Sequence, residues 1–135
     1  MVTSFDMRMA QLDALVAECR DHEPFASAVV RDASNRSNRD WPWWGVEVQQ
    51  SQVDGADNRR ITATITLVST QAGEPSHFKA DWTAQTWYST SGGQPRTQHG
   101  SHEVPWDDPT ADMLIAAVDR LLTDARAALP SWAKG

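Results

Sequence analysis

The first apolar pattern in the chain has the spacing of a helix. Five apolar side chains recur at steps of three or four residues near the N-terminus: Phe5, Met9, Leu12, Val16 and Cys19. Side chains at such steps lie on one face of an α-helix, and charged residues such as Asp6 and Asp13 fall off this face. The pattern therefore predicts an amphipathic helix that buries one side.

The next segment allows two interpretations. Glu23-Pro24 suits the start of a short second helix, because proline is favoured at the first helical position. Such a helix would turn apolar side chains inward, namely Phe25, Val29 and Val30. A strand through Ala28–Val30 is the alternative. The polar and aperiodic run Ser34–Arg39 indicates a loop.

Three stretches then alternate apolar and polar side chains, which is the period of a half-buried strand. Their apolar positions are Trp44, Val46 and Val48, then Ile61, Ala63, Ile65 and Leu67, then Phe78, Ala80, Trp82 and Ala84, with Tyr88 as an optional continuation. Clusters of turn-forming residues follow each stretch, at Asp54–Asn58, Ala72–Ser76 and Ser91–Pro95. A fourth, weaker strand is expected within Thr97–Val104.

The last pattern predicts a long helix over residues 109–129. Asp108 is the expected N-cap, Pro109 suits the first helical position, and Pro130 ends the helix. Its apolar stripe comprises Leu114, Val118, Leu121, Leu122, Ala125 and Leu129. At 1.5 Å per residue such a helix is about 30 Å long, enough to cross a whole sheet.

These elements give the order α–(α)–β–β–β–(β)–α, in which brackets mark the weakest patterns. Alternation with turn-rich connections is typical of an antiparallel meander that is apolar on one face. The sequence thus predicts an α+β fold with a meander of three or four strands, and with the N- and C-terminal helices packed on one face. The length of 135 residues fits a single domain, 1–135.

Composition narrows the class of protein. Hydrophobic residues at 40% and charged residues at 22% are typical of a folded soluble protein. No apolar run approaches the roughly 18 residues needed to cross a bilayer, and the first residues lack the pattern of a signal peptide, so we expect no membrane association. The lone Cys19 cannot form an internal disulfide, which favours a reducing compartment and a cytoplasmic protein.

Charge argues against one large class of partners. The formal net charge is −6 and no basic stripe exists, so we expect no generic nucleic-acid binding. The α–β–β–β–α order resembles the topology of the double-stranded-RNA-binding domain. That family carries lysines where this chain has Asp107, Asp108 and Asp112, so the resemblance does not imply RNA binding. The acidic charge and the terminal amphipathic helices are also similar to those of small secretion chaperones.

The sharpest chemical cluster consists of His99, His102 and Glu103. Two imidazoles and a carboxylate could bind zinc or act as general acid and base. In a strand, however, positions 99 and 102 point to opposite faces, so we interpret the segment as a solvated loop. We expect no catalytic residues, no bound metal and no cofactor. Cys19 and His22 could form a Cys–His pair, but Cys19 continues the apolar stripe and is expected in the core.

Seven tryptophans are more than a small domain easily buries, so we expect some at a surface that meets another molecule. Trp41, Trp43 and Trp44 crowd together before the first long strand, where they either cap the core or form a binding surface. Trp87 falls on the polar phase of its strand and could anchor a partner there. Trp106 and Trp132 flank the last helix.

The preferred partner site is an acidic edge beside Trp106. Four acids lie within ten residues of the chain, with no basic residue among them: Glu103, Asp107, Asp108 and Asp112. An aromatic anchor supplies affinity, and nearby charge steers the encounter. The simpler explanation is that these acids favour the positive end of the helix dipole.

The sequence thus favours a small acidic binding protein that is not an enzyme. It would dock on another protein and mask it, as immunity proteins and phage-encoded inhibitors of bacterial defence do. Three alternatives stay open: an enzyme built on the His99 cluster, a carrier of a small ligand between tryptophans, and a protein similar to secretion chaperones. A homodimer is a further open alternative.

Overall fold

The computed structural model describes residues 4–37, 41–54, 57–69, 75–88 and 96–129. Its elements are α1 (Ser4–Cys19), β1 (Val29–Asp32), β2 (Trp43–Asp54), β3 (Asp57–Ser69), β4 (Pro75–Tyr88), β5 (Arg96–His102) and α2 (Ala111–Ala127). The predicted α+β class and antiparallel meander are confirmed, but the sheet has five strands rather than three or four.

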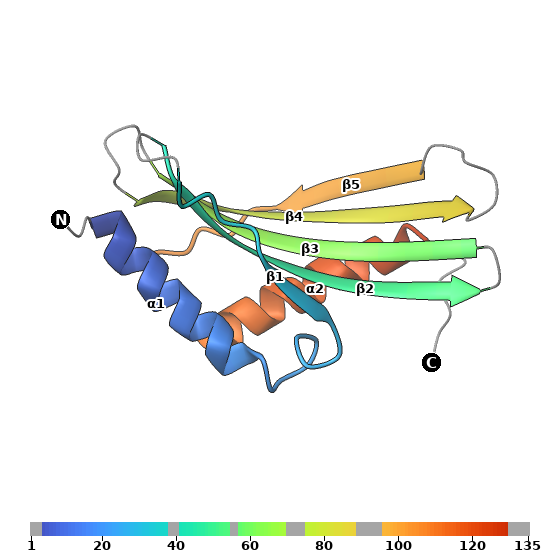
Figure 1. The fold of residues 1–135 in the computed structure, drawn as a ribbon, viewed down its shortest axis with the longest axis horizontal. Helices are drawn as coiled ribbons and strands as arrows, with labels where there is room; N and C mark the ends of the chain where they lie inside the picture. The colour runs from blue at the N-terminus through green and yellow to red at the C-terminus, as the bar shows by residue number, and fades with distance from the viewer. Residues whose placement is uncertain (1–3, 38–40, 55–56, 70–74, 89–95, 130–135) are drawn as a thin grey trace.

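Each strand pairs antiparallel with the next, in the order β1-β2-β3-β4-β5. Val46 of β2 lies opposite Ile65 of β3, which lies opposite Ala80 of β4, so the apolar positions of the long strands share one face. Both helices lie on that face (Figure 1). We call the side covered by the helices the inner face and the opposite side the outer face. A shift of one residue along a strand would exchange the two faces. The predicted alternation therefore assigned the apolar side chains to the correct face.

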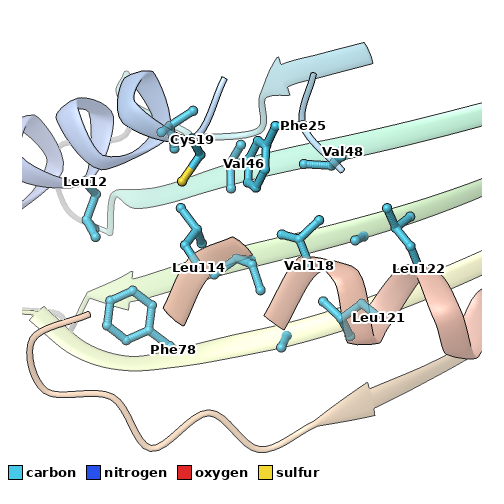
Figure 2. Close-up of a cluster of buried hydrophobic side chains, with 14 of the residues drawn as sticks. Leu12, Cys19, Phe25, Val46, Val48, Phe78, Leu114, Val118, Leu121 and Leu122 are labelled. Carbon is cyan, nitrogen blue, oxygen red and sulfur yellow. The ribbon is translucent and has the colours of Figure 1, made fainter. Parts of the chain in front are cut away.

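The hydrophobic core fills the space between the inner face and the two helices. The predicted apolar stripes of both helices are buried: Phe5, Met9, Leu12, Val16 and Cys19, and Leu114, Val118, Leu121, Leu122, Ala125 and Leu129. Figure 2 shows Leu114 and Val118 among side chains from the strands and from α1. Full burial of one such leucine or valine contributes roughly 1.5–3 kcal/mol, so this shared cluster holds the two layers together.

Strand β1 corrects the prediction of a second short helix. Residues 20–28 form turns instead, in which Ala26 N–H donates to the His22 carbonyl at 2.9 Å. The strand alternative was correct, because the β-branched pair Val29-Val30 pairs with β2. Phe25 is buried as expected and Val30 is half-buried. Val29, expected to point inward, is 53% exposed on the outer face.

The N-cap of α2 is Thr110 rather than Asp108. The Thr110 side chain accepts a hydrogen bond from the backbone N–H of Met113 at 3.3 Å, which satisfies one of the free donors of the first turn. Asp108 lies two residues too early and contacts Arg8 of α1 instead. In the described part of the chain, no helix is long and apolar enough to span a membrane.

The loop expected around the two histidines is a strand. Residues Arg96–His102 form β5, which pairs with β4 from Thr86 to Ala80. The weaker strand expected within Thr97–Val104 is therefore confirmed, and the interpretation of positions 99–102 as a loop was wrong. The strand is defined by backbone pairing at the edge of the sheet and buries few of its own side chains.

Candidate functional site

The described tryptophans differ in exposure. Trp44 is 1% exposed, and Trp82, Trp87 and Trp106 are half-buried. Trp41 and Trp43 are 47% and 37% exposed, respectively, and they lie two residues apart. The three tryptophans of the Trp41–Trp44 segment therefore do not share one environment. Trp44 completes the core, and its neighbours present indole surface to solvent. Trp132 lies outside the described residues.

Trp41 and Trp43 line an open hollow of about 460 Å³ on the outer face. The other lining residues are Thr66, Val68 and Lys79. The sheet register brings them together, because Trp43 lies opposite Val68, and Thr66 lies opposite Lys79 in the next row. We call these five residues the Trp41–Lys79 hollow.

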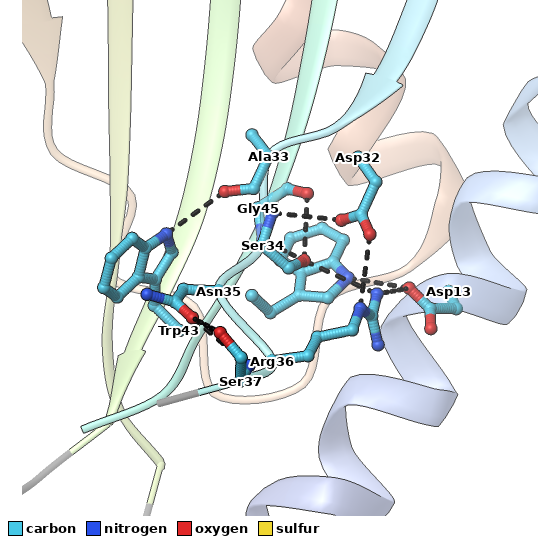
Figure 3. A network of polar contacts seen from close by, with 10 residues as sticks. Asp13, Asp32, Ala33, Ser34, Asn35, Arg36, Ser37, Trp43 and Gly45 are labelled. Atoms are coloured by element: carbon cyan, nitrogen blue, oxygen red, sulfur yellow. Dashed lines mark hydrogen bonds and ion pairs between the residues drawn. The ribbon is translucent and has the colours of Figure 1, made fainter. Parts of the chain in front are cut away.

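Trp43 is held on the outer face by its backbone and by its ring. Its backbone N–H and carbonyl both bond to Asn35, at 3.2 and 2.8 Å. Its indole Nε1–H donates to the Ala33 carbonyl at 3.1 Å (Figure 3). A Cβ at position 45 would lie 3.0 Å from that same carbonyl oxygen, so glycine allows this close approach. The ring is thus oriented with its donor already satisfied.

Trp44 points the other way and is tied to α1. Its Nε1–H donates to Asp13 Oδ1 at 3.0 Å, and Arg36 Nη2 donates to the same oxygen at 3.0 Å. Arg36 also forms an ion pair with Asp32 at 3.2 Å (Figure 3). On the far side, Ser69 Oγ donates to the Pro42 carbonyl at 2.6 Å. The segment that carries the exposed indoles is therefore fixed to α1, to residues 33–35 after β1, and to β3.

The charges of this network are stabilised in their ionised forms. Burial tends to raise the pKa of Asp32, but hydrogen bonds from the hydroxyl and backbone N–H of Ser34, together with Arg36, hold the pKa below its ordinary value. The hydrogen bond to Asp13 raises the pKa of Arg36. Both groups thus stay charged near neutral pH, and the network persists there.

The central rows of the outer face beyond the hollow are mostly polar. The expected row of threonines is present, with Thr62 opposite Thr83 and Thr64 opposite Asp81. Trp87 lies on this face as its phase predicted, but Arg60 stacks over its ring at 5.0 Å. In the described part of the chain the Arg60 Nε atom is buried without a hydrogen-bond partner, and the guanidinium lies over the indole ring. Trp87 thus offers less free surface than expected.

The acidic edge beside Trp106 is altered by residues distant in sequence. The Trp106 ring packs edge-on against Phe78 with centroids 5.4 Å apart, and it is half-buried against the core. Arg8 of α1 donates to the Asp108 carboxylate at 3.2 Å and to the Asp107 carbonyl at 2.6 Å. A cation therefore lies among acids that have no basic neighbour in sequence. Glu103, Asp107, Asp108 and Asp112 are exposed.

The histidine cluster does not assemble on one face. His99 lies opposite Thr83 on the outer face, and His102 lies opposite Ala80 on the inner face, as strand geometry predicts. His102 Nε2 pairs with Asp124 of α2, a partner that sequence reasoning missed because it lies 22 residues away. Among the described residues, no group of three His, Cys, Asp or Glu side chains could hold a metal ion.

A second hollow, of about 310 Å³, lies beside this pair. Its walls are apolar except for three polar side chains: His102, Glu103 and Arg120. The carboxylate of Glu103 and the guanidinium of Arg120 have opposite charge, so the hollow has no single electrostatic preference. The geometry brings His102 and Glu103 to one site, as the sequence suggested, but it excludes His99 from that site.

Cys19 is a core residue, as its place in the apolar stripe predicted. It is fully buried, and its Sγ contacts the Ala111 carbonyl oxygen at 3.6 Å. Burial, with the nearby carboxylates of Glu18 and Asp112, raises the pKa of its thiol to about 11. At neutral pH the thiolate fraction is then on the order of one in ten thousand, so this thiol is a poor nucleophile.

Comparison of the chain with protein-family models, with curated proteins and with solved structures finds no match.

Proposed function

We propose that the chain is a binding protein that docks on another protein through the outer face of its sheet and masks part of that partner. Trp41 and Trp43 are the anchors of this contact. The observation that carries the proposal is that these two indoles are exposed two residues apart and that a hydrogen bond holds the Trp43 ring, while Trp44 between α1 and the sheet is buried. Fixed aromatic side chains of this kind dominate the energetics of many interfaces, because little entropy is lost on binding.

This proposal moves the preferred site away from the acidic edge beside Trp106. There the indole already packs on Phe78, and Arg8 lies against Asp108. A partner at that edge would therefore meet less exposed apolar surface and less net negative charge than the sequence alone suggests. Docking at the Trp41–Lys79 hollow leaves the helix layer free and needs no change in the core. A reducing compartment such as the cytoplasm belongs to the proposal, because it suits the lone buried thiol of Cys19.

Site-specific photo-crosslinking in the native host tests the proposal. A photoreactive benzoylphenylalanine in place of Trp41 should capture one partner protein, because this position lies at the proposed contact. The same group in place of Asp119, an exposed residue of α2, should capture none.

The captured partner then allows a quantitative test. Trp41→Ala and Trp43→Ala should each weaken its binding by at least about 30-fold, the loss expected for a hot-spot residue worth about 2 kcal/mol. The double change Asp107→Lys with Asp108→Lys should bind like the parent protein. The opposite result, with binding lost on charge reversal and kept without the indoles, would place the partner at the acidic edge and overturn the proposal.

A further inference from the structure

We infer that the Trp41–Lys79 hollow takes an acidic segment of the partner, in which an apolar or aromatic side chain sits between the indoles and an adjacent carboxylate meets Lys79. This inference rests on the proposed function and names the chemistry of the occupant. It follows from the charge, the shape and the available hydrogen-bonding groups of the hollow, which are considered in turn.

Lys79 is a cation without a partner among the described residues. It lies on β4 at the wall of the hollow, exposed to solvent. Three other cations of the fold are engaged: Arg8 pairs with Asp108, Arg36 with Asp13 and Asp32, and Arg60 stacks on Trp87. No described residue therefore competes with an anion from outside for its ammonium group.

Among the described residues that line the hollow, none carries a carboxylate. Glu47 and Asp81 lie on the outer face in the next row of the sheet, with Thr64 between them. Asp81 is two residues from Lys79 along β4, about 7 Å at the rise of a strand, and no ion pair joins them. The described lining of the hollow thus carries one positive charge, although the whole chain carries −6. At physiological ionic strength, salt screens the repulsion between distant acids of the chain and an acidic segment over about 8 Å. The charge of the hollow itself therefore dominates the electrostatic interaction once the segment is in contact.

Shape favours a protruding side chain over an enclosed small ligand. Four of the five lining residues belong to the strands of one sheet, so the hollow has a floor and a rim but no opposite wall. The Trp43 Nε1–H is already bonded to Ala33, so this ring offers its flat face. Flat indole surface beside Val68 suits an apolar or aromatic group.

Lys79 also excludes the main competing occupant. Exposed indole faces attract cations as well as apolar groups, so a lysine or arginine of a partner could sit on them. The ammonium group of Lys79 at the same hollow repels such a cation. A single residue therefore sets the preference for an acidic over a basic segment, and this makes the inference testable.

The test uses three capped peptides, Ac-Glu-Trp-Glu-NH2, Ac-Gln-Trp-Gln-NH2 and Ac-Lys-Trp-Lys-NH2, titrated into the full ¹⁵N-labelled chain. The readouts are the indole N–H signals of Trp41 and Trp43 and the backbone signals of Thr66 and Val68. We expect the acidic peptide to bind about three- to fivefold more tightly than the neutral one, the range for one exposed ion pair. The basic peptide should bind most weakly.

Charge variants assign the preference to one residue. Lys79→Gln should abolish the difference between the acidic and neutral peptides, and Lys79→Glu should make the basic peptide the tightest binder. The matched control is Arg96→Glu, which makes the same change of charge at an exposed position of β5. This control should keep the parent order.

Two outcomes would overturn the inference: equal affinity for the acidic and neutral peptides, or an order that Lys79→Glu leaves unchanged. Photo-crosslinking at position 41 separates this failure from failure of the proposed function. A partner captured there that binds Lys79→Glu as tightly as the parent protein would refute the acidic segment alone. Capture of no partner would refute the docking site as well.

Discussion

At the scale of single residues, Trp44 combines core packing with a hydrogen bond to α1. Trp44→Ala should lower the free energy of unfolding by about 3–5 kcal/mol, because it opens a cavity and leaves Asp13 without its indole donor. Trp87→Ala should cost only about 1 kcal/mol, because that ring is half-buried and its identified close contact is the stack with Arg60. Chemical denaturation of both variants measures the difference.

The comparison also tests the assignment of faces. Trp44 and Trp87 lie on opposite sides of the sheet, at the inner and outer faces, respectively. Equal denaturation midpoints for the two variants would contradict that register. A matched change on the outer face, Trp43→Ala, should cost less than Trp44→Ala, since it removes a half-exposed ring and one hydrogen bond.

At the scale of elements, the start of α2 allows the contribution of a helix cap to stability to be compared with that of a surface ion pair. Thr110→Ala should lower the free energy of unfolding by about 1 kcal/mol, because it removes the acceptor of the Met113 N–H. Asp108→Ala should change it by at most about 0.5 kcal/mol, because the Asp108 side chain is 91% exposed where it meets Arg8. Urea denaturation of both variants is the measurement. A larger loss of stability for Asp108→Ala than for Thr110→Ala would indicate that Asp108 is the N-cap, as the sequence predicted.

The elements that sequence predicted well are those that bury one face. The stripes of α1 and α2 and the alternation of β2, β3 and β4 each repeat often enough to define a period. Strand β1 has four residues and follows Pro24, so its signal was confused with a helix start. Strand β5 lies at the edge of the sheet and is mostly polar, so backbone pairing specifies it and apolar alternation does not.

The candidate site was predictable in part. The exposure of Trp43 on the face opposite Trp44 follows from the two-residue period of a strand, once the phase of β2 is known, whereas Trp41 precedes the strand. The association of these indoles with Lys79 does not follow from that period, because it depends on the register across β3 and β4. The contacts of Arg8 with Asp108 and of His102 with Asp124 likewise join distant segments. No local pattern carries such pairings.

At the scale of the whole molecule, an ionic network joins the helix layer to the sheet edge. Arg36 bridges Asp13 of α1 and Asp32 of β1. The pKa of Asp32 is lower in the folded than in the unfolded state, so its contribution to stability is present above the unfolded value near 4 and is lost as pH falls through the folded one. Asp32→Asn should therefore lose less stability than the parent protein between about pH 5 and pH 3.

Urea denaturation across that pH range measures this effect, which should be modest because the Asp32 side chain is more than half exposed. Asp81→Asn is the matched control, since it removes an exposed carboxylate of the sheet that lies outside the network. The control should follow the parent curve. An identical acid response in Asp32→Asn and the parent protein would show that the network does not stabilise the fold.

The first and last helices pack on each other, although they lie near opposite ends of the sequence. Arg8 of α1 contacts Asp107 and Asp108, and Cys19 contacts Ala111 at the start of α2. During synthesis, α1 and the meander leave the ribosome before α2 exists to cover the inner face. High sequence separation between contacting residues slows folding, and bare apolar sheet is prone to aggregate. The nascent chain therefore passes through a stage in which its uncovered inner face favours binding by chaperones. This stage ends when α2 leaves the ribosome and covers that face.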